Sequence, residues 1–327
     1  MRYGSFVSGL IALAFGLPAP AQQYQPPQHL APPPAVGVST EDFGALADLG
    51  ITTERDRSPQ WQLAEQRRLD AALAAIKPQR AGVVDVYVLA VGLDSDAVFG
   101  REAREAGRVL ARRYGAEGRT VVLAGSDGTA DSDLPAGSPS NIALVLACMA
   151  EVMDKREDVL ALYTTSHGGP FGIVYNDASN GYGAISPARL LNLFQSLGIE
   201  RRIVIVSACY SGIFVPFLRG ENSVVVTAAD SAHTSFGCQA DSDWTFFGDA
   251  MVNHALRKRQ PLAAAGAEAQ GLIGEWEAKG HLQPSGPQVS VGAQAHAWLD
   301  ALDARAPAVP SASVGTPAVS LLDRMAR

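Results

Sequence analysis

The sequences LYTTSHGGPFG (residues 162–172) and IVIVSACYSG (residues 203–212) decide the fold. Each is a run of apolar and β-branched residues that ends in a turn of small residues. His167 stands at the end of the first run and Cys209 at the end of the second. Such runs are typical of strands buried on both faces of a parallel sheet. Because the carboxyl ends of parallel strands share one edge, we expect the imidazole and the thiol to lie near each other there.

Further apolar runs on both sides of these two alternate with helical patterns. The predicted strands cover residues 83–92, 120–124, 158–165, 203–208 and 222–228, and a short one covers 288–291. The predicted helices cover residues 59–76, 99–114, 141–153, 186–198, 243–256 (capped by Asp243) and 262–279. Strands that alternate with helices predict an α/β fold with a parallel, doubly wound sheet and right-handed crossovers.

The composition of the 327 residues, 47% hydrophobic and 18% charged, is typical of a globular protein with a sizeable core. The net charge is −7 and the sequence contains no basic stripe, so we expect no nucleic-acid partner. With only three cysteines, the chain is no disulfide scaffold.

The N-terminus has the pattern of a signal peptide at residues 1–21. Arg2 precedes an apolar run at residues 6–17, and Ala19-Pro20-Ala21 gives a small-x-small cleavage pattern. We therefore expect export to the periplasm or the extracellular space, with a mature chain that starts near Gln22. An uncleaved N-terminal anchor is the alternative. The apolar run is short for a membrane span, and we expect no other span in the chain.

The residue types at the two strand ends suit acyl chemistry. A thiol must lose its proton to attack a carbonyl, and an imidazole can accept that proton near neutral pH. The negative charge that develops on the carbonyl oxygen needs N–H donors. We predict Cys209 as the nucleophile, His167 as base and acid, and the N–H groups of Gly168 and Cys209 as the oxyanion hole. No histidine has metal-ligand spacing, so we expect no metal and no cofactor.

These motifs resemble those of a known family. A strand ending in Ser166-His167-Gly168, and a later strand ending in Ala208-Cys209 before Ser211-Gly212, resemble the legumain (asparaginyl endopeptidase) family of caspase-like clan cysteine peptidases. The resemblance covers roughly residues 82–256 and includes Thr227-Ala228-Ala229, the stretch 235–238 and the stretch 245–249. It implies a caspase-like three-layer α/β/α sandwich with a mostly parallel central sheet. It also implies a polypeptide substrate and endopeptidase activity through a His/Cys dyad with no required third member.

The resemblance also implies a specificity pocket. Legumains use an acidic residue two positions before the nucleophile, a serine, an aspartate and an arginine beyond the first strand. Ser235 and Asp249 match the serine and the aspartate, and Arg101 is a looser match to the arginine. Ser207 stands where the family has glutamate, which removes a carboxylate and alters the charge of the pocket. Asparagine specificity therefore does not follow.

The sequence leaves the reaction and the organisation of the chain partly open. The leading interpretation is an exported cysteine endopeptidase. Ligation or transpeptidation through the same thioester, and a non-catalytic binding module, are the alternatives. We expect a Pro-rich linker or propeptide at residues 22–58, the peptidase domain at 59–300 and an Ala/Pro-rich tail at 301–327, mobile over 305–318.

The two remaining cysteines have no predicted role in the chemistry. Cys148 lies among apolar residues on a predicted helix and is expected in the core. Cys238 is expected to be a buried free thiol, with a bridge to Cys148 as the alternative.

Overall fold

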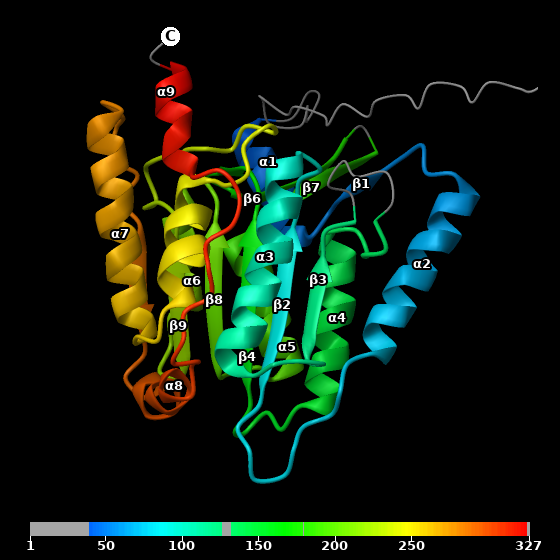
Figure 1. Ribbon diagram of the computed structural model, residues 1–327. Helices are drawn as coiled ribbons and strands as arrows, with labels where there is room; N and C mark the ends of the chain where they lie inside the picture. The colour runs from blue at the N-terminus through cyan, green and yellow to red at the C-terminus, as the bar shows by residue number, and fades with distance from the viewer. Residues whose placement is uncertain (1–38, 126–131, 179, 326–327) are drawn as a thin grey trace, which may run out of the picture.

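The computed structural model describes residues 39–125, 132–178 and 180–325 (Figure 1). The predicted signal peptide and the Pro-rich residues 22–38 lie outside the described residues.

A six-stranded sheet forms the centre of the molecule, in the order β10-β9-β8-β4-β2-β3. Its strands are β2 (Val86–Gly92), β3 (Thr120–Leu123), β4 (Val159–Thr165), β8 (Arg202–Ser207), β9 (Ser223–Thr227) and β10 (Gln288–Val291). All neighbours are parallel except β10, which pairs antiparallel with β9 at the edge. The predicted, mostly parallel sheet is confirmed.

Two apolar cores lie on the two faces of this sheet. Along β2, Val86, Val88 and Ala90 face one core, and Tyr87 and Leu89 face the other. This alternation follows from the two-residue period of a strand. The molecule is therefore a three-layer α/β/α sandwich, as predicted.

The helices that supply these cores have the following bounds. The first core includes side chains from α3 (Ala97–Tyr114), η2 (Gly248–His254), η3 (Ala255–Arg257), α7 (Leu262–Lys279) and α8 (Ala295–Ala304). The second includes side chains from α2 (Pro59–Ala74), α4 (Pro139–Val152), α5 (Pro187–Leu197), η1 (Ser211–Phe214) and α6 (Val215–Leu218).

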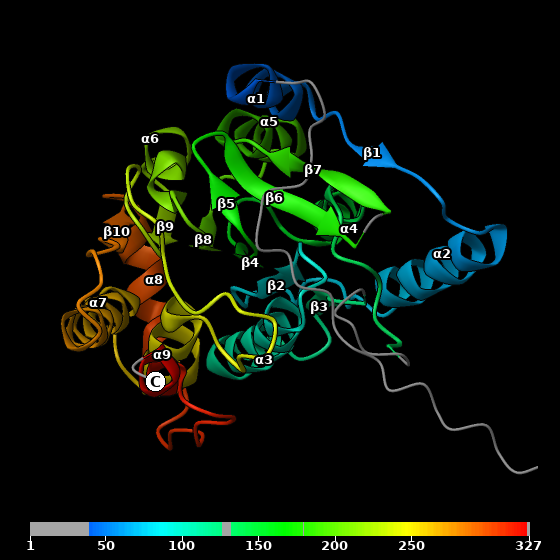
Figure 2. The ribbon, with the colours of Figure 1, turned by 90° about the horizontal axis from the view of Figure 1, so that it is seen from above.

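A second, antiparallel sheet was not predicted from the sequence. Its order is β1-β7-β6-β5, built from β1 (Thr53–Glu54), β5 (Gly168–Gly169), β6 (Gly172–Asp177) and β7 (Gly181–Ile185). Strands β5, β6 and β7 follow directly after His167 in the chain, and the sheet lies beside α5 and α1 (Thr40–Leu49) (Figure 2). The described part of the predicted linker, residues 39–58, thus forms α1 and β1 and packs on the domain.

The C-terminal stretch differs from the expected mobile tail. The amide of Val314 donates to Asn253 Oδ1 (2.8 Å), and the amide of Ala318 donates to Asp249 Oδ2 (2.7 Å). The stretch then continues as η4 (Ala318–Ser320) and α9 (Leu321–Met325). The Ala/Pro/Ser-rich composition of this stretch does not predict these contacts, because they are made by backbone amides and not by side chains.

The predicted helix from 243 to 256 also differs. Helical structure begins only at Phe246, continues from Gly248 as the π-helical η2 and passes into the 3₁₀-helical η3. Asp243 caps no helix because its Oδ2 accepts the amide of Thr316 (2.8 Å).

No helix within the described part of the chain is both long enough and apolar enough to cross a membrane.

Candidate active site

His167 and Cys209 stand at the ends of neighbouring parallel strands. Thr165 on β4 is in register with Ser207 on β8, and each catalytic candidate follows two residues after its member of that pair. The amide of Ser166 extends the contact by donating to the carbonyl of Ser207 (3.1 Å). The register therefore brings together the two residues that the sequence predicted to meet.

The turn after His167 lies directly against the turn at Cys209. A Cβ atom on Gly168 would lie 2.2 Å from the carbonyl oxygen of Cys209 and 3.0 Å from the Cβ of Ala208. Real Cβ atoms do not approach a carbonyl oxygen this closely. Only glycine at position 168 lets the two turns touch, which places two predicted oxyanion-hole residues side by side.

His167 is mostly buried beside a carboxylate that the sequence reasoning missed. Asp96, at the N-cap of α3, places Oδ2 3.8 Å from the Nε2 atom of His167. The ring of Phe99 packs edge-on against the imidazole, with 5.0 Å between centroids. Burial alone lowers the pKa of His167, but Asp96, Cys238 and Asp94 outweigh it and raise that pKa to about 10. The imidazole is therefore protonated at neutral pH.

The thiol of Cys209 receives a backbone donor. The amide of Ser235 donates to Sγ (3.3 Å), and the carbonyl and hydroxyl oxygens of Ser235 lie 3.6 and 3.7 Å from the same sulfur. Burial and Cys238 raise the pKa of the Cys209 thiol, whereas Ser235 and the charge of His167 lower it, with a net rise. The resting pair is a thiol beside an imidazolium, and Ser235 and His167 both stabilise the thiolate.

The loop that carries Ser235 also brings the thiol of Cys238 close to His167. The amide of Tyr210, next to Cys209, donates to the carbonyl of His233 in this loop (2.9 Å). Cys238 helps to raise the pKa of His167. Cys148 instead lies on α4, with its sulfur 4.0 Å from the carbonyl of Leu73. All three cysteines are free, so the alternative bridge between Cys148 and Cys238 is absent.

Two of the residues predicted for the specificity pocket are engaged with other parts of the protein. Arg101 donates from Nη2 to the carbonyls of Ala240 (2.8 Å) and Ser242. Asp249 is fully buried, and its Oδ1 accepts the side-chain amide of Asn253 (2.7 Å), while Oδ2 holds the C-terminal stretch as described above.

Ser207, which stands where the legumain family has glutamate, contacts the carboxylate of another residue. Its hydroxyl donates to Oε1 of Glu102 on α3 (2.8 Å). A carboxyl group therefore lies beside position 207, but it comes from α3 and not from the strand that carries Ser207.

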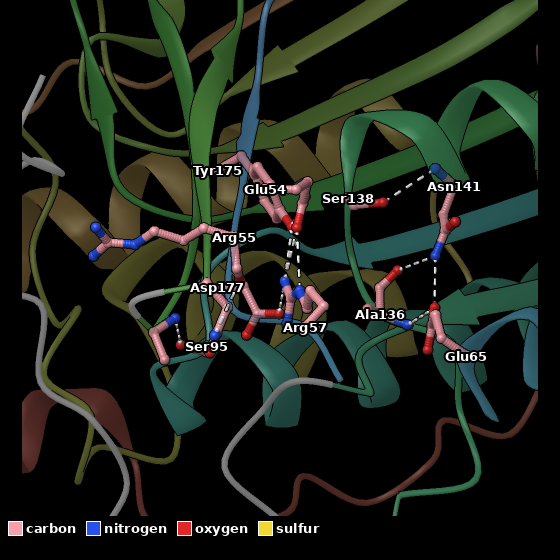
Figure 3. A network of polar contacts seen from close by, with 12 residues as sticks. Glu54, Arg55, Arg57, Glu65, Ser95, Ala136, Ser138, Asn141, Tyr175 and Asp177 are labelled. Carbon is pink, nitrogen blue, oxygen red and sulfur yellow. Dashed lines mark hydrogen bonds and ion pairs between the residues drawn. The ribbon is translucent and has the colours of Figure 1, made fainter. Parts of the chain in front are cut away.

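The loop that carries Asp96 is supported from behind by β6. The amide of Ser95 donates to the carbonyl of Asn176 (3.0 Å), and the amide of Ala178 donates to the Ser95 hydroxyl (2.9 Å). Figure 3 shows that Asp177, between them, points toward Arg57 of the N-terminal segment. Their ion pair is 2.6 Å long and about 90% buried on both sides. The N-terminal segment, β6 and the Asp96 loop thus form one connected support.

The position of Asp96 shortly after a predicted strand was a signal that the sequence contained. The sequence Asp94-Ser95-Asp96 follows directly after a predicted strand, at the same sheet edge as His167. A carboxylate at that edge is a signal for an imidazole partner. Glu102, in contrast, lies within a helix and carries no such signal.

Comparison with known proteins gives two similarities. Residues 140–269 match the model of the Peptidase C13 family. Among solved structures, the chain is similar to caspase-1 from Spodoptera frugiperda, with 12% identity and a TM-score of 0.43, over 66% of this chain and 92% of the caspase chain. No curated protein matches the sequence. The stretch that carries His167, Cys209 and Ser235 is therefore similar to the Peptidase C13 (legumain) family, and this similarity supports a cysteine peptidase.

Proposed function

We propose that the protein is an endopeptidase that hydrolyses peptide bonds through Cys209 and His167 and a thioester intermediate. The observation that carries the proposal is the contact between the two strand ends. Gly168, next to His167, lies against the carbonyl of Cys209, and the Ser235 amide donates to the sulfur. A structural cysteine needs neither an imidazolium neighbour nor an N–H donor aimed at its sulfur.

The geometry supports a reaction in two stages. The Cys209 thiol first loses its proton to the solvent, which gives a thiolate beside an imidazolium, and the thiolate attacks the substrate carbonyl. In this proposal the N–H groups of Gly168 and Cys209 receive the oxyanion. The imidazolium of His167 then donates its proton to the leaving amine, which leaves the acyl group on sulfur. Water, deprotonated by the neutral His167, hydrolyses the thioester.

A pulse of iodoacetamide followed by mass spectrometry tests the pair. We expect Cys209 to be alkylated faster in the wild type than in His167→Ala, because the variant lacks the positive imidazolium that stabilises the thiolate. Cys148, whose pKa is raised by burial and by Glu151, is the internal control for a thiol on another element, α4. Alkylation of Cys209 at the rate of Cys148, unchanged by His167→Ala, would refute the proposed pair.

A peptide library then tests the reaction itself. We expect internal cleavage of peptides, with no cleavage by Cys209→Ala. Adding a competing amine distinguishes hydrolysis from acyl transfer, since hydrolysed product alone is expected. Amide products formed with the added amine would instead assign a ligase or transpeptidase.

A further inference from the structure

We propose that Glu102 is a positioning residue that anchors the loop over the nucleophile and so holds the Ser235 amide on the Cys209 sulfur. The inference rests on the proposed function only in taking Cys209 as the nucleophile. It concerns thiol reactivity, which can be measured without a substrate.

The carboxylate of Glu102 joins three elements of the site. Its side chain is fully buried and comes from α3. Oε1 accepts the hydroxyl of Tyr163 on β4 (2.5 Å) and the hydroxyl of Ser207 on β8 (2.8 Å). Oε2 accepts both the amide (3.1 Å) and the hydroxyl (2.8 Å) of Thr245. The His-bearing strand, the Cys-bearing strand and the loop therefore meet at one carboxylate.

Core packing alone does not explain a carboxylate here. All four donors are neutral, and the transfer of an ionised carboxylate from water into a core costs several kcal/mol. An apolar side chain of similar volume would be easier to bury. The chain also leaves room for the carboxylate, because a Cβ atom on Gly248 would lie 2.0 Å from Oε2. A charged acceptor makes stronger hydrogen bonds than a neutral one, so this group fixes its donors firmly.

The C-terminal end of the loop that carries Ser235 is held by α3. Arg101, beside Glu102, donates to the carbonyls of Ala240 and Ser242, and Glu102 holds Thr245. Ser235, within the same loop, donates to Cys209 Sγ. If Thr245 is released, the loop loses one of its anchors and the Ser235 amide loses its fixed position. The thiolate of Cys209 then loses a donor.

The pH profile of Cys209 alkylation tests this chain of contacts. We expect Glu102→Gln and Thr245→Val to move the midpoint of the profile to higher pH and to slow alkylation at pH 7 about tenfold, the effect of one pKa unit. Tyr163→Phe is the matched control because it removes a hydrogen bond to the same carboxylate from β4 rather than from the loop. It should lower the melting temperature and leave the midpoint unchanged.

Each result decides the proposal. An unchanged midpoint in Thr245→Val, or the same shift in Tyr163→Phe, would mean that Glu102 serves the fold alone. Should Glu102→Gln fail to fold, Thr245→Val and Tyr163→Phe still decide. A rate of Cys209 alkylation that is the same in the wild type and in His167→Ala would refute the proposed function. The difference between the alkylation midpoints of Thr245→Val and Tyr163→Phe would still test the role of Glu102 independently.

Discussion

The state of His167 depends on what surrounds its ring. Burial opposes the charged imidazolium, whereas the Asp96 carboxylate 3.8 Å from Nε2 favours it and, together with Cys238 and Asp94, raises the pKa to about 10. An imidazolium at neutral pH is suited to hold a thiolate and to protonate a leaving amine. On this basis Asp96 favours the charged form of His167, and a carboxylate lies beside the imidazole.

Replacing Asp96 with Asn should lower the pKa of His167. The folded-state pKa is raised, so the stabilisation that Asp96 gives is complete below the ordinary histidine pKa of about 6.5 and disappears as pH rises through about 10. The wild type should therefore be more stable than Asp96→Asn at pH 6, and this difference should vanish above pH 10. NMR titration of the imidazole and urea unfolding at several pH values measure both effects.

Asp230→Asn is the matched control for that variant. It removes a carboxylate 2.7 Å from the Nδ1 atom of a different histidine, His233. It should leave the titration of His167 unchanged. Equal titration of His167 in the wild type and in Asp96→Asn would contradict the role of Asp96.

The small antiparallel sheet acts as a support for the site. β6 contacts the Asp96 loop on one side and the N-terminal segment on the other. Arg57 forms ion pairs with Asp177 at 2.6 Å and with Glu54 at 3.1 Å (Figure 3). It also stacks on Trp61, with its guanidinium carbon 4.0 Å from the ring centroid. Burial lowers the pKa of Arg57, but Asp177, Tyr175 and Glu54 outweigh it and raise that pKa.

Removing Arg57 should destabilise the protein strongly. Arg57→Ala leaves the carboxylate of Asp177 buried without this cation, so we expect a loss of about 3 kcal/mol in the free energy of unfolding. Lys258→Ala is the control, because its 2.6 Å ion pair with Glu268 is half exposed on the lysine side. It should cost less than about 1 kcal/mol. Urea unfolding measures both, and similar losses in the two variants would contradict the supporting role of Arg57.

At the scale of the whole molecule, the C-terminal stretch closes the core around η2. Trp244 donates from Nε1 to the carbonyl of Val314 (2.9 Å), and Asn253 and Asp249 bind the amides of Val314 and Ala318. Both are fully or almost fully buried. The Ala/Pro-rich tail is thus part of the folded unit. Asp249, which was predicted to bind substrate, binds this tail instead.

Asp249→Ala should therefore act on stability through the tail. We expect a lower melting temperature, and faster cleavage of the tail in limited proteolysis. Deleting residues 314–327 should lower the melting temperature similarly, and the two changes together should lower it by less than their sum, because they remove the same contacts. Fully additive effects, or a wild-type melting temperature in Asp249→Ala, would show that Asp249 does not act through the tail.

The sequence by itself determined the central strands and the two reactive side chains. Runs such as the one at residues 159–165 are apolar, β-branched and bounded by turn residues, so local pattern is enough to identify them as strands. Because parallel strands end at one edge, the meeting of His167 and Cys209 followed from that pattern. β5, β6 and β7 did not follow, since their glycines weaken the strand signal and only pairing defines them.

Only the tertiary structure decided what surrounds that pair. Asp96 comes from the end of another strand, and Glu102 comes from a helix more than a hundred residues before Ser207. Asp249 matches a substrate-binding aspartate of the legumain motif, but its side chain binds the C-terminal tail. Side-chain partners across such separations depend on how layers pack and not on local pattern. The sequence therefore predicted the reactive groups, and packing set their charge and their support.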